Sequence, residues 1–336
     1  MVGTDLLVER DGELESANSS LDAVAAGEGR VISVEGPPGI GKSALLGAIR
    51  ESAAELGFTA FAARGSELES DFPFGIVRQL FEAPLLDREA RVALLADAAA
   101  PAGAVFEPDA EPPGGAVSFS VLHGLYWMTS NLAGEEPTLL VVDDLHWCDR
   151  PSLRYLAYLV NRLEGTRIGV LAGLRSTEPG TDPALIADIV GGPSAVAVRP
   201  GPLSGDAVAE IVAARFEQRG ETEFEDACRS ATGGNPLLLN QLLSGLSLEG
   251  AAPTARDART VREVGPRVVS RTVLARLSRL PNEATAVARA LAILGDDSDL
   301  GAVAELSGSE PSDVARLTGS LAQAEILLAG APLGFV

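Results

Sequence analysis

The sequence predicts an α/β fold, in which helices cover both faces of a parallel sheet, followed by an all-helical region. Two observations lead to this prediction. Short apolar segments alternate with helix-like segments through residues 1–202, and such alternation is typical of a parallel sheet. After about residue 203 the strand-like segments stop, and amphipathic helical segments fill the rest of the chain.

Five segments have the composition of strands. The third, PTLLVVDD, is a continuous apolar run of the kind expected for a strand buried on both faces. A helix is expected from about Lys42, and another after Asp149, with Pro151 in its first turn. A long insertion separates the second and third strands, and its Pro/Gly-rich part, 106–116, predicts a surface loop. The five predicted strands are 30–36, 58–65, 137–144, 167–175 and 195–200.

The chain of 336 residues is long enough for more than one domain. We expect an α/β domain over residues 1–202, a small helical domain over 203–250 and a further helical domain over 251–336. The stretch 249–258 has the composition of a linker. The chain ends in APLGFV, an apolar pair just after an apparent turn, which suggests a cut within a domain. We therefore also expect the sequence to be a fragment of a longer protein.

Charge and composition exclude several classes of function. The formal net charge of −21 repels a phosphate backbone, so direct DNA binding by this chain is not expected. No apolar run reaches about 18 residues, and the acidic N-terminus lacks the features of a signal peptide. The two cysteines, Cys148 and Cys228, are far apart in sequence. A reduced, cytoplasmic protein without a membrane span is therefore expected.

The first predicted strand is followed by a glycine-rich loop. Its sequence, GPPGIGKS, matches G-x-x-x-x-G-K-[ST] between a strand and a helix, which is the context of a P-loop. The glycines allow the backbone N–H groups to surround a phosphate, and Lys42, the only lysine of the chain, supplies an ammonium. The alternative is a Gly/Pro turn with Lys42 on the surface. The residues predicted to bind the phosphates are Gly36, Pro37, Pro38, Gly39, Ile40, Gly41, Lys42, Ser43 and Ala44.

Acidic residues at the end of the third strand complete the predicted site. We expect Asp143, together with Ser43, to hold Mg²⁺. Asp144 can polarise the attacking water, or it can be a helix-capping or loop acid. Because aspartate reaches less far than glutamate, we expect slow hydrolysis. Arg175 ends the next strand, where it can sense the γ-phosphate or form a surface ion pair.

These motifs together resemble the nucleotide-binding region of the large LuxR-type transcriptional regulators of actinobacteria, which are STAND-class P-loop ATPases and include MalT-like activators. The resemblance covers nearly the whole chain. The segments that carry it are LLVERDGELE, GPPGIGKS, DFPFGIVRQLFE, LLVVDDLHWCDRPSLRYLAYL, LAGLRSTEP, ATGGNPLLL and VREVGPRVVSRTVLARLSRLP. The fold that it implies is an AAA+/STAND-like P-loop sheet, a helical lid and a winged-helix-like domain.

The resemblance also implies ligands and roles for individual residues. The ligand would be ATP or ADP with Mg²⁺, with Val8 and Arg10 near the adenine and Pro236 contacting the nucleotide from the lid. Members of the family usually have glycine before that arginine, whereas this chain has Glu9. The winged-helix-like domain would be truncated. A helical-repeat sensor and a C-terminal helix-turn-helix of the same polypeptide would follow.

Arginines of the last region leave two interpretations open. A solvated helix face or an interdomain contact is the commoner use of such a run, and DNA binding by winged-helix geometry is the other. For an arginine finger acting on a neighbouring copy, Arg150, Arg154 and Arg162 are candidates. The arginines of the run are Arg256, Arg259, Arg262, Arg267, Arg271, Arg276 and Arg279.

Three functions compete. The first is a switch of a LuxR-type regulator, in which ATP or ADP occupancy controls domain angle and ATP-dependent self-association. The second is a P-loop kinase or ATPase motor whose output is hydrolysis itself. The third is an interaction scaffold with a degenerate site, against which the intact set Lys42, Ser43 and Asp143 argues.

Overall fold

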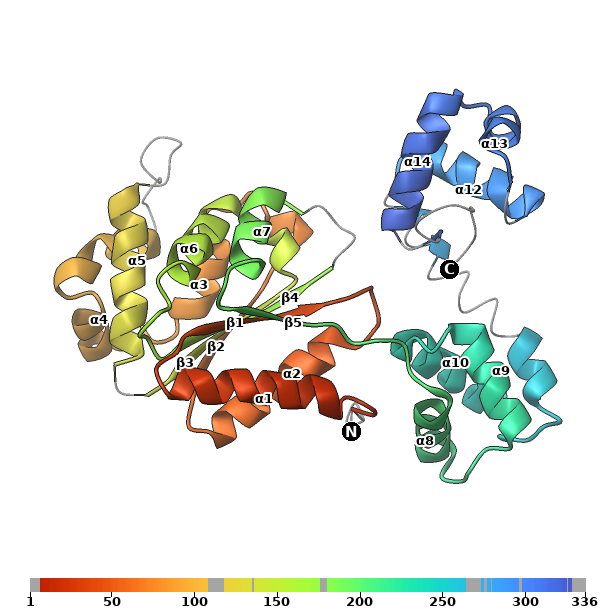
Figure 1. Cartoon of the computed structure of the whole chain (residues 1–336), viewed down its shortest axis with the longest axis horizontal. Helices are drawn as coiled ribbons and strands as arrows, with labels where there is room; N and C mark the ends of the chain where they lie inside the picture. Colours follow the sequence, from red (N-terminus) through yellow and green to blue (C-terminus); the bar gives the residue numbers. More distant parts are fainter. Residues whose placement is uncertain are drawn as a thin grey trace. The chain divides into compact units, whose positions relative to one another are not determined.

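The computed structural model describes residues 7–107, 118–134, 136–175, 180–263, 273–274, 277–278, 280–295, 298–324 and 326–327. The chain forms two compact units, Met1–Gly201 and Pro202–Val336. Figure 1 shows the elements of each unit. Among the described residues, no helix is both long enough and apolar enough to cross a membrane.

A five-stranded parallel sheet forms the centre of the first unit. Its strands lie in the order β2-β3-β4-β1-β5, so that β4 separates β1 from β3. Each of the five predicted strands is present; the three central strands, β1, β3 and β4, are buried, whereas the edge strands β2 and β5 are partly exposed. The strands are β1 (Arg30–Glu35), β2 (Thr59–Arg64), β3 (Thr138–Asp143), β4 (Ile168–Leu174) and β5 (Ala195–Val198).

Helices cover both faces of this sheet, which confirms the predicted fold class (Figure 1). On one face, α1 (Asp11–Ala25) and α2 (Lys42–Glu55) enclose a core with Ile32 and Val34. On the other face, a larger core includes residues of the insertion such as Phe81, Leu125 and Tyr155. The elements of this side are η1 (Glu67–Glu69), α3 (Gly75–Phe81), α4 (Arg88–Leu94), η2 (Asp97–Phe106), α5 (Phe119–Leu132), η3 (Leu145–Trp147), α6 (Arg150–Val160) and α7 (Pro183–Val190).

The strand order brings three predicted parts of the site to one edge. The strands are parallel, so their carboxyl ends lie on the same side of the sheet. The loop from Gly36 follows β1, Arg175 follows β4, and Asp143 ends β3. Because β4 lies between the other two strands, residues more than a hundred positions apart in sequence become neighbours.

The second unit contains two helical groups. The helices α8, α9 and α10 pack on one another, while α12, α13 and α14 surround a core that includes Val287, Leu291 and Leu317. The predicted boundary at residue 250 and the winged-helix-like character of 251–336 stay predictions. Arg267, Arg271, Arg276 and Arg279 lie outside the described residues. The helices are α8 (Gly205–Phe216), α9 (Thr222–Thr232), α10 (Pro236–Leu248), α12 (Asn282–Leu294), α13 (Leu300–Ser307) and α14 (Pro311–Gln323).

Candidate nucleotide-binding site

The loop between β1 and α2 has the backbone conformation that its glycines permit. Gly39 and Gly41 have φ values of 82° and 101°, in the region that side chains disfavour. Gly41 is also the N-cap of α2, and no side chain accepts a hydrogen bond from the first turn of this helix. By contrast, α6 is capped by the carboxylate of Asp149. The N-terminus of a helix that lacks a side-chain cap is a suitable place for an anion.

The ammonium of Lys42 lies inside this loop rather than on the surface. The residue is only 8% exposed. Its Nζ donates to the carbonyl oxygens of Gly36, at 2.7 Å, and of Pro37, at 2.8 Å. The interpretation of Lys42 as a surface residue beside a turn is therefore wrong. A buried ammonium in a glycine-rich loop at the N-terminus of a helix is suited to a phosphate chain.

Two predicted magnesium ligands meet at the edge of the sheet. The hydroxyl of Ser43 donates to Oδ2 of Asp143 at 2.7 Å, although the residues are 100 positions apart. Gly173 of β4 makes room for this carboxylate, since a Cβ there would lie 2.6 Å from Oδ1 of Asp143. A hydroxyl and a carboxylate oxygen side by side match the ligand chemistry of Mg²⁺, so the residues present fit this ion.

The next carboxylate is held by an arginine that the sequence analysis did not single out. Arg64, the last residue of β2, donates to Oδ2 of Asp144 from Nε at 3.1 Å and from Nη2 at 3.0 Å. The hydrogen bond and the negative charge of Asp144 raise the pKa of Arg64. Asp144 has a left-handed backbone, with φ of 52°. The sequence shows an arginine at the end of a predicted strand. It does not show which acid this arginine contacts, because that contact depends on β2 pairing with β3.

Neighbouring residues hold this pair in place. The side chain of Gln79 accepts from the backbone N–H of Arg64 at 2.9 Å and donates to its carbonyl at 3.3 Å. Gly65 approaches Asp144 so closely that a Cβ would lie 2.3 Å from the carbonyl oxygen of Asp144. Arg64 is thus positioned through its backbone by α3, and its exposed side chain reaches across to the acid.

The helix that carries Gln79 is itself fastened by Asp149. This carboxylate is 2% exposed and accepts from the backbone N–H groups of Phe74, at 2.8 Å, and Ile76, at 3.2 Å. It also accepts from Ser152 N at 2.9 Å, which confirms the predicted helix cap. The contact with α3 was missed, because the sequence pattern revealed only the cap.

Arg175 and His146 also lie at this edge. Arg175 is half-buried directly after β4, between the strands that carry the loop and the two acids. His146 is 1% exposed, with Nε2 at 3.9 Å from Oδ1 of Asp144 and its ring against that of Trp147. The structure therefore places Arg175 where a γ-phosphate sensor is expected, and its role stays a prediction.

The N-terminal segment that was expected near the adenine is largely buried. Val8 is 8% and Arg10 is 6% exposed. Arg10 donates to the carbonyl oxygen of Gly201 at 2.6 Å and to Glu13 at 3.2 Å. Glu9 has φ of 59°, a conformation that glycine adopts freely.

Pro236 belongs to the second unit. It follows Asn235, whose side chain caps α10 by accepting from the N–H groups of Leu237 and Leu238. Its local role is thus that of a proline in the first turn of a helix. A contact with nucleotide stays a prediction.

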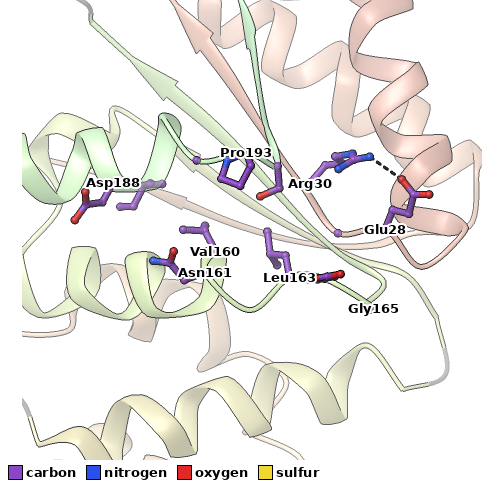
Figure 2. Close-up of a pocket in the computed structure, with 13 residues that line it drawn as sticks. Glu28, Arg30, Val160, Asn161, Leu163, Gly165, Asp188 and Pro193 are labelled. Atoms are coloured by element: carbon purple, nitrogen blue, oxygen red, sulfur yellow. Dashed lines mark hydrogen bonds and ion pairs between the residues drawn. The ribbon is translucent and has the colours of Figure 1, made fainter.

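A separate pocket lies at the opposite edge of the sheet. Figure 2 shows this pocket of about 500 Å³, lined by residues from the segment before β1 and from the loops before β4 and β5. An ion pair between Arg30 and Glu28, at 2.6 Å, stands at its side (Figure 2). Because these segments precede the strands, the pocket is distinct from the site at their carboxyl ends.

Comparison with known proteins defines the class of the first unit. Residues 6–171 match the AAA ATPase domain family. This part of the chain is therefore an AAA-type P-loop ATPase domain, a nucleotide-binding domain, as its sheet and loop indicate. No curated protein sequence matches the chain.

Comparison with solved structures finds one with a TM-score above 0.5 among those described next. A Walker-type ATPase of Pyrococcus abyssi is similar with a TM-score of 0.62 and 13% identity, over 97% of this chain and 92% of that one. A RuvB variant of Thermotoga maritima has a TM-score of 0.49 and 13% identity, over 97% and 92% of the two chains. Cdc6p of Pyrobaculum aerophilum has a TM-score of 0.48 and 15% identity, over 97% and 89%. At 13% identity, the likeness to the Pyrococcus protein concerns the fold alone.

Proposed function

We propose that the chain is the ATP/ADP-binding switch module of a LuxR-family transcriptional regulator. Slow, Mg²⁺-dependent hydrolysis would control its conformation and its self-association. The module would work in the cytoplasm, without binding DNA or a membrane itself. Its partners would be an adenine nucleotide, other copies of the protein, and sensor and helix-turn-helix domains of the same polypeptide.

The observation that carries this proposal is the pair Arg64 and Asp144. A general base must accept a proton from the attacking water. Nε and Nη2 of Arg64 both donate to the same oxygen of Asp144, Oδ2, so this oxygen is already engaged by the guanidinium. A carboxylate whose oxygen is engaged by an arginine is less available to the attacking water, which would slow the chemical step and keep nucleotide bound for long periods. A long-lived bound state suits a switch better than a motor.

The proposal gives roles to the other residues, and those of Val8, Arg10 and Pro236 rest on the family resemblance. Lys42 and the N–H groups of the loop bind the phosphates, and Ser43 with Asp143 holds Mg²⁺. Bound Mg²⁺ would neutralise charge on the phosphates. Arg175 senses the γ-phosphate, while Val8 and Arg10 lie near the adenine. Pro236 contributes from the helical lid.

A nucleotide-binding experiment tests the proposal. The affinities of the purified chain for ATP and ADP with Mg²⁺ are measured by calorimetry, and phosphate release is followed over time. We expect tight ADP retention and turnover far below about one per second. Fast, repeated turnover would instead favour the second function, an ATPase motor or kinase. Light scattering with each nucleotide tests self-association.

Variants make this experiment specific to the site. We expect Lys42→Ala to weaken ATP binding at least about tenfold, because a buried ammonium that faces the phosphates is lost. Arg199→Ala is the matched control, since this exposed arginine pairs with Glu35 next to the loop. Absence of nucleotide binding, or unchanged binding by Lys42→Ala, would contradict the proposal.

A further inference from the structure

An exposed aromatic surface lies on α5 and α6, away from the nucleotide site. We call it the aromatic patch. It holds two of the three tyrosines, one of the two tryptophans and one of the two histidines of the chain. Such concentration in a chain with 4% aromatic residues marks this surface as unusual. The patch consists of Phe119, His123, Tyr126, Trp127, Arg154, Tyr158 and Arg162.

The α5 side of the patch is a stripe along one helix face. Phe119, His123 and Trp127 are four residues apart, a spacing that places them on one side of a helix. Phe119 is 67% and Trp127 is 40% exposed, which is a large apolar area for a surface helix. The opposite face is fixed against η2, where a Cβ on Gly124 would lie 2.7 Å from the backbone nitrogen of Ala102. The stripe therefore cannot turn inward.

The α6 side adds positive charge to the rings. The helices α5 and α6 pack together in the first unit (Figure 1). Arg154 and Tyr158 lie one turn apart on α6, and Arg162 follows just beyond its end. The guanidinium of Arg162 lies 3.7 Å from the ring centroid of Tyr158, which is a close cation–π contact.

Ring contacts and hydrogen bonds join the two sides into one rigid surface. The rings of Phe119 and His123 are stacked at 6.0 Å, and Phe119 meets Tyr158 edge to face at 5.6 Å. The indole N–H of Trp127 donates to Nε2 of His123 at 3.0 Å, and Nδ1 of the same ring lies at 3.2 Å from the hydroxyl oxygen of Tyr158. A surface ordered before binding loses little entropy when a partner arrives.

The charge around the patch indicates the kind of partner. The helices α5 and α6 contain no aspartate or glutamate. Of the two arginines of α6, Arg150 pairs with Asp182 and Arg154 belongs to the patch, and Arg162 follows the helix. The whole chain has 47 acidic residues and a net charge of −21. Two helices that carry arginines and no acidic residue, on so acidic a protein, complement negative charge. A nucleic acid carries that charge too, but the net charge of the chain repels a long phosphate backbone.

We propose that the aromatic patch binds an acidic peptide segment of a partner protein, one in which carboxylates alternate with aromatic or proline side chains. The partner's apolar side chains stack on Phe119 and Trp127, and its carboxylates pair with Arg162 and Arg154. Aromatic and arginine side chains are the groups that contribute most at protein interfaces. This inference does not depend on nucleotide binding.

Tryptophan fluorescence of the full chain provides the test. The probe is a synthetic peptide of four Glu-Phe-Pro repeats, and its twin replaces every glutamate with glutamine. We expect the acidic peptide to shift the emission of Trp127 and to saturate at a Kd about tenfold lower than that of its twin. Trp127→Phe, which leaves Trp147, removes the shift. Arg162→Gln abolishes the difference between the two peptides, and Phe119→Ala weakens both about tenfold.

Controls come from the other face of the sheet. Arg50→Gln changes an exposed arginine on α2, and Leu56→Ala changes an exposed apolar side chain just after this helix. Both variants should bind the acidic peptide with the affinity of the original chain. No saturable shift, or equal affinity for the two peptides, overturns the proposal. So does tighter binding of a single-stranded oligonucleotide than of the acidic peptide. If the chain self-associates and Phe119→Ala abolishes this self-association, the occupant of the patch is a second copy of the chain, and the proposal is overturned as well.

Discussion

Arg64 donates two hydrogen bonds to a single carboxylate oxygen of Asp144, at 3.1 and 3.0 Å. The arginine side chain is 70% exposed and the aspartate side chain 13% exposed, so the pair sits at the rim of the candidate site. An exposed ion pair contributes little to stability. We expect its effect to be on chemistry instead, because it engages the carboxylate that stands next to the predicted magnesium ligands.

Removal of the arginine is expected to accelerate hydrolysis. In Arg64→Ala, both lone-pair directions of Oδ2 become available to water, so turnover should rise about tenfold, a fraction of what a general base contributes. Nucleotide affinity should change by less than about twofold, because Arg64 does not touch the loop. Single-turnover phosphate release and ATP affinity are the measurements.

A second substitution tests whether this effect passes through Asp144. Asp144→Asn should lower turnover about a hundredfold, and Arg64→Ala should add nothing in that background. If the arginine variant accelerates hydrolysis equally in both backgrounds, Asp144 is not the residue that Arg64 restrains.

Glycine at position 173 is expected to be required for the fold around Asp143. A Cβ in Gly173→Ala would lie 2.6 Å from Oδ1 of Asp143 and 2.8 Å from the side chain of Leu46. We expect a loss of about 2 kcal/mol in the free energy of unfolding, the usual cost of overpacking. Gly47→Ala is the control: no atom lies within 4 Å of its Cβ, so it should stabilise α2 by about 0.5 kcal/mol. Urea denaturation measures both.

Asp149 is expected to contribute strongly to stability. Asp149→Ala leaves three buried N–H groups, of Phe74, Ile76 and Ser152, without their acceptor, and should cost about 3 kcal/mol. Asp149→Asn retains one acceptor oxygen and should cost about half as much. Asp87→Ala removes an exposed helix cap on α4 and should cost only about 1 kcal/mol. Equal losses for Asp87→Ala and Asp149→Ala would contradict the role of the α3 contact.

The stability of the chain is expected to fall at alkaline pH because of its thiols. Burial raises the pKa of Cys228 to about 12 and that of Cys148 well above its ordinary value. The folded state therefore keeps a proton that the unfolded state releases near pH 9. The contribution of Cys228 to the free energy of unfolding is complete below pH 9. It decreases as the pH rises from 9 to about 12, by up to about 1.4 kcal/mol per pH unit.

The variant Cys228→Ala isolates this contribution. It removes one titrating group, so the slope of unfolding free energy against pH between 9 and 12 should become smaller. Urea denaturation across this range measures the slope. An unchanged slope would mean that the thiol of Cys228 titrates alike in the folded and unfolded chains.

The parts of the site that depend on neighbouring residues in sequence could be predicted. The strand, the loop and the first helix were expected from contiguous residues, and Lys42 lies in the loop, where it donates to Gly36 and Pro37. The meeting of Ser43 and Asp143 was also expected, since parallel strands align their carboxyl ends. Contacts between nucleotide and Val8, Arg10 or Pro236 rest on the family resemblance and stay predictions.

Other features were decided only by the tertiary structure. By itself, the sequence determined which segments form strands, where the phosphate-binding loop stands, and where helices begin, because turns, caps and apolar periodicity act over a few residues. It did not reveal that Arg64 faces Asp144, because this contact requires β2 to pair with β3 and α3 to hold the end of β2. Nor did it reveal that Asp149 fastens α3, or that Phe119 meets Tyr158 on a neighbouring helix. Such contacts join segments distant in sequence, and the packing of whole elements decides which side chains meet.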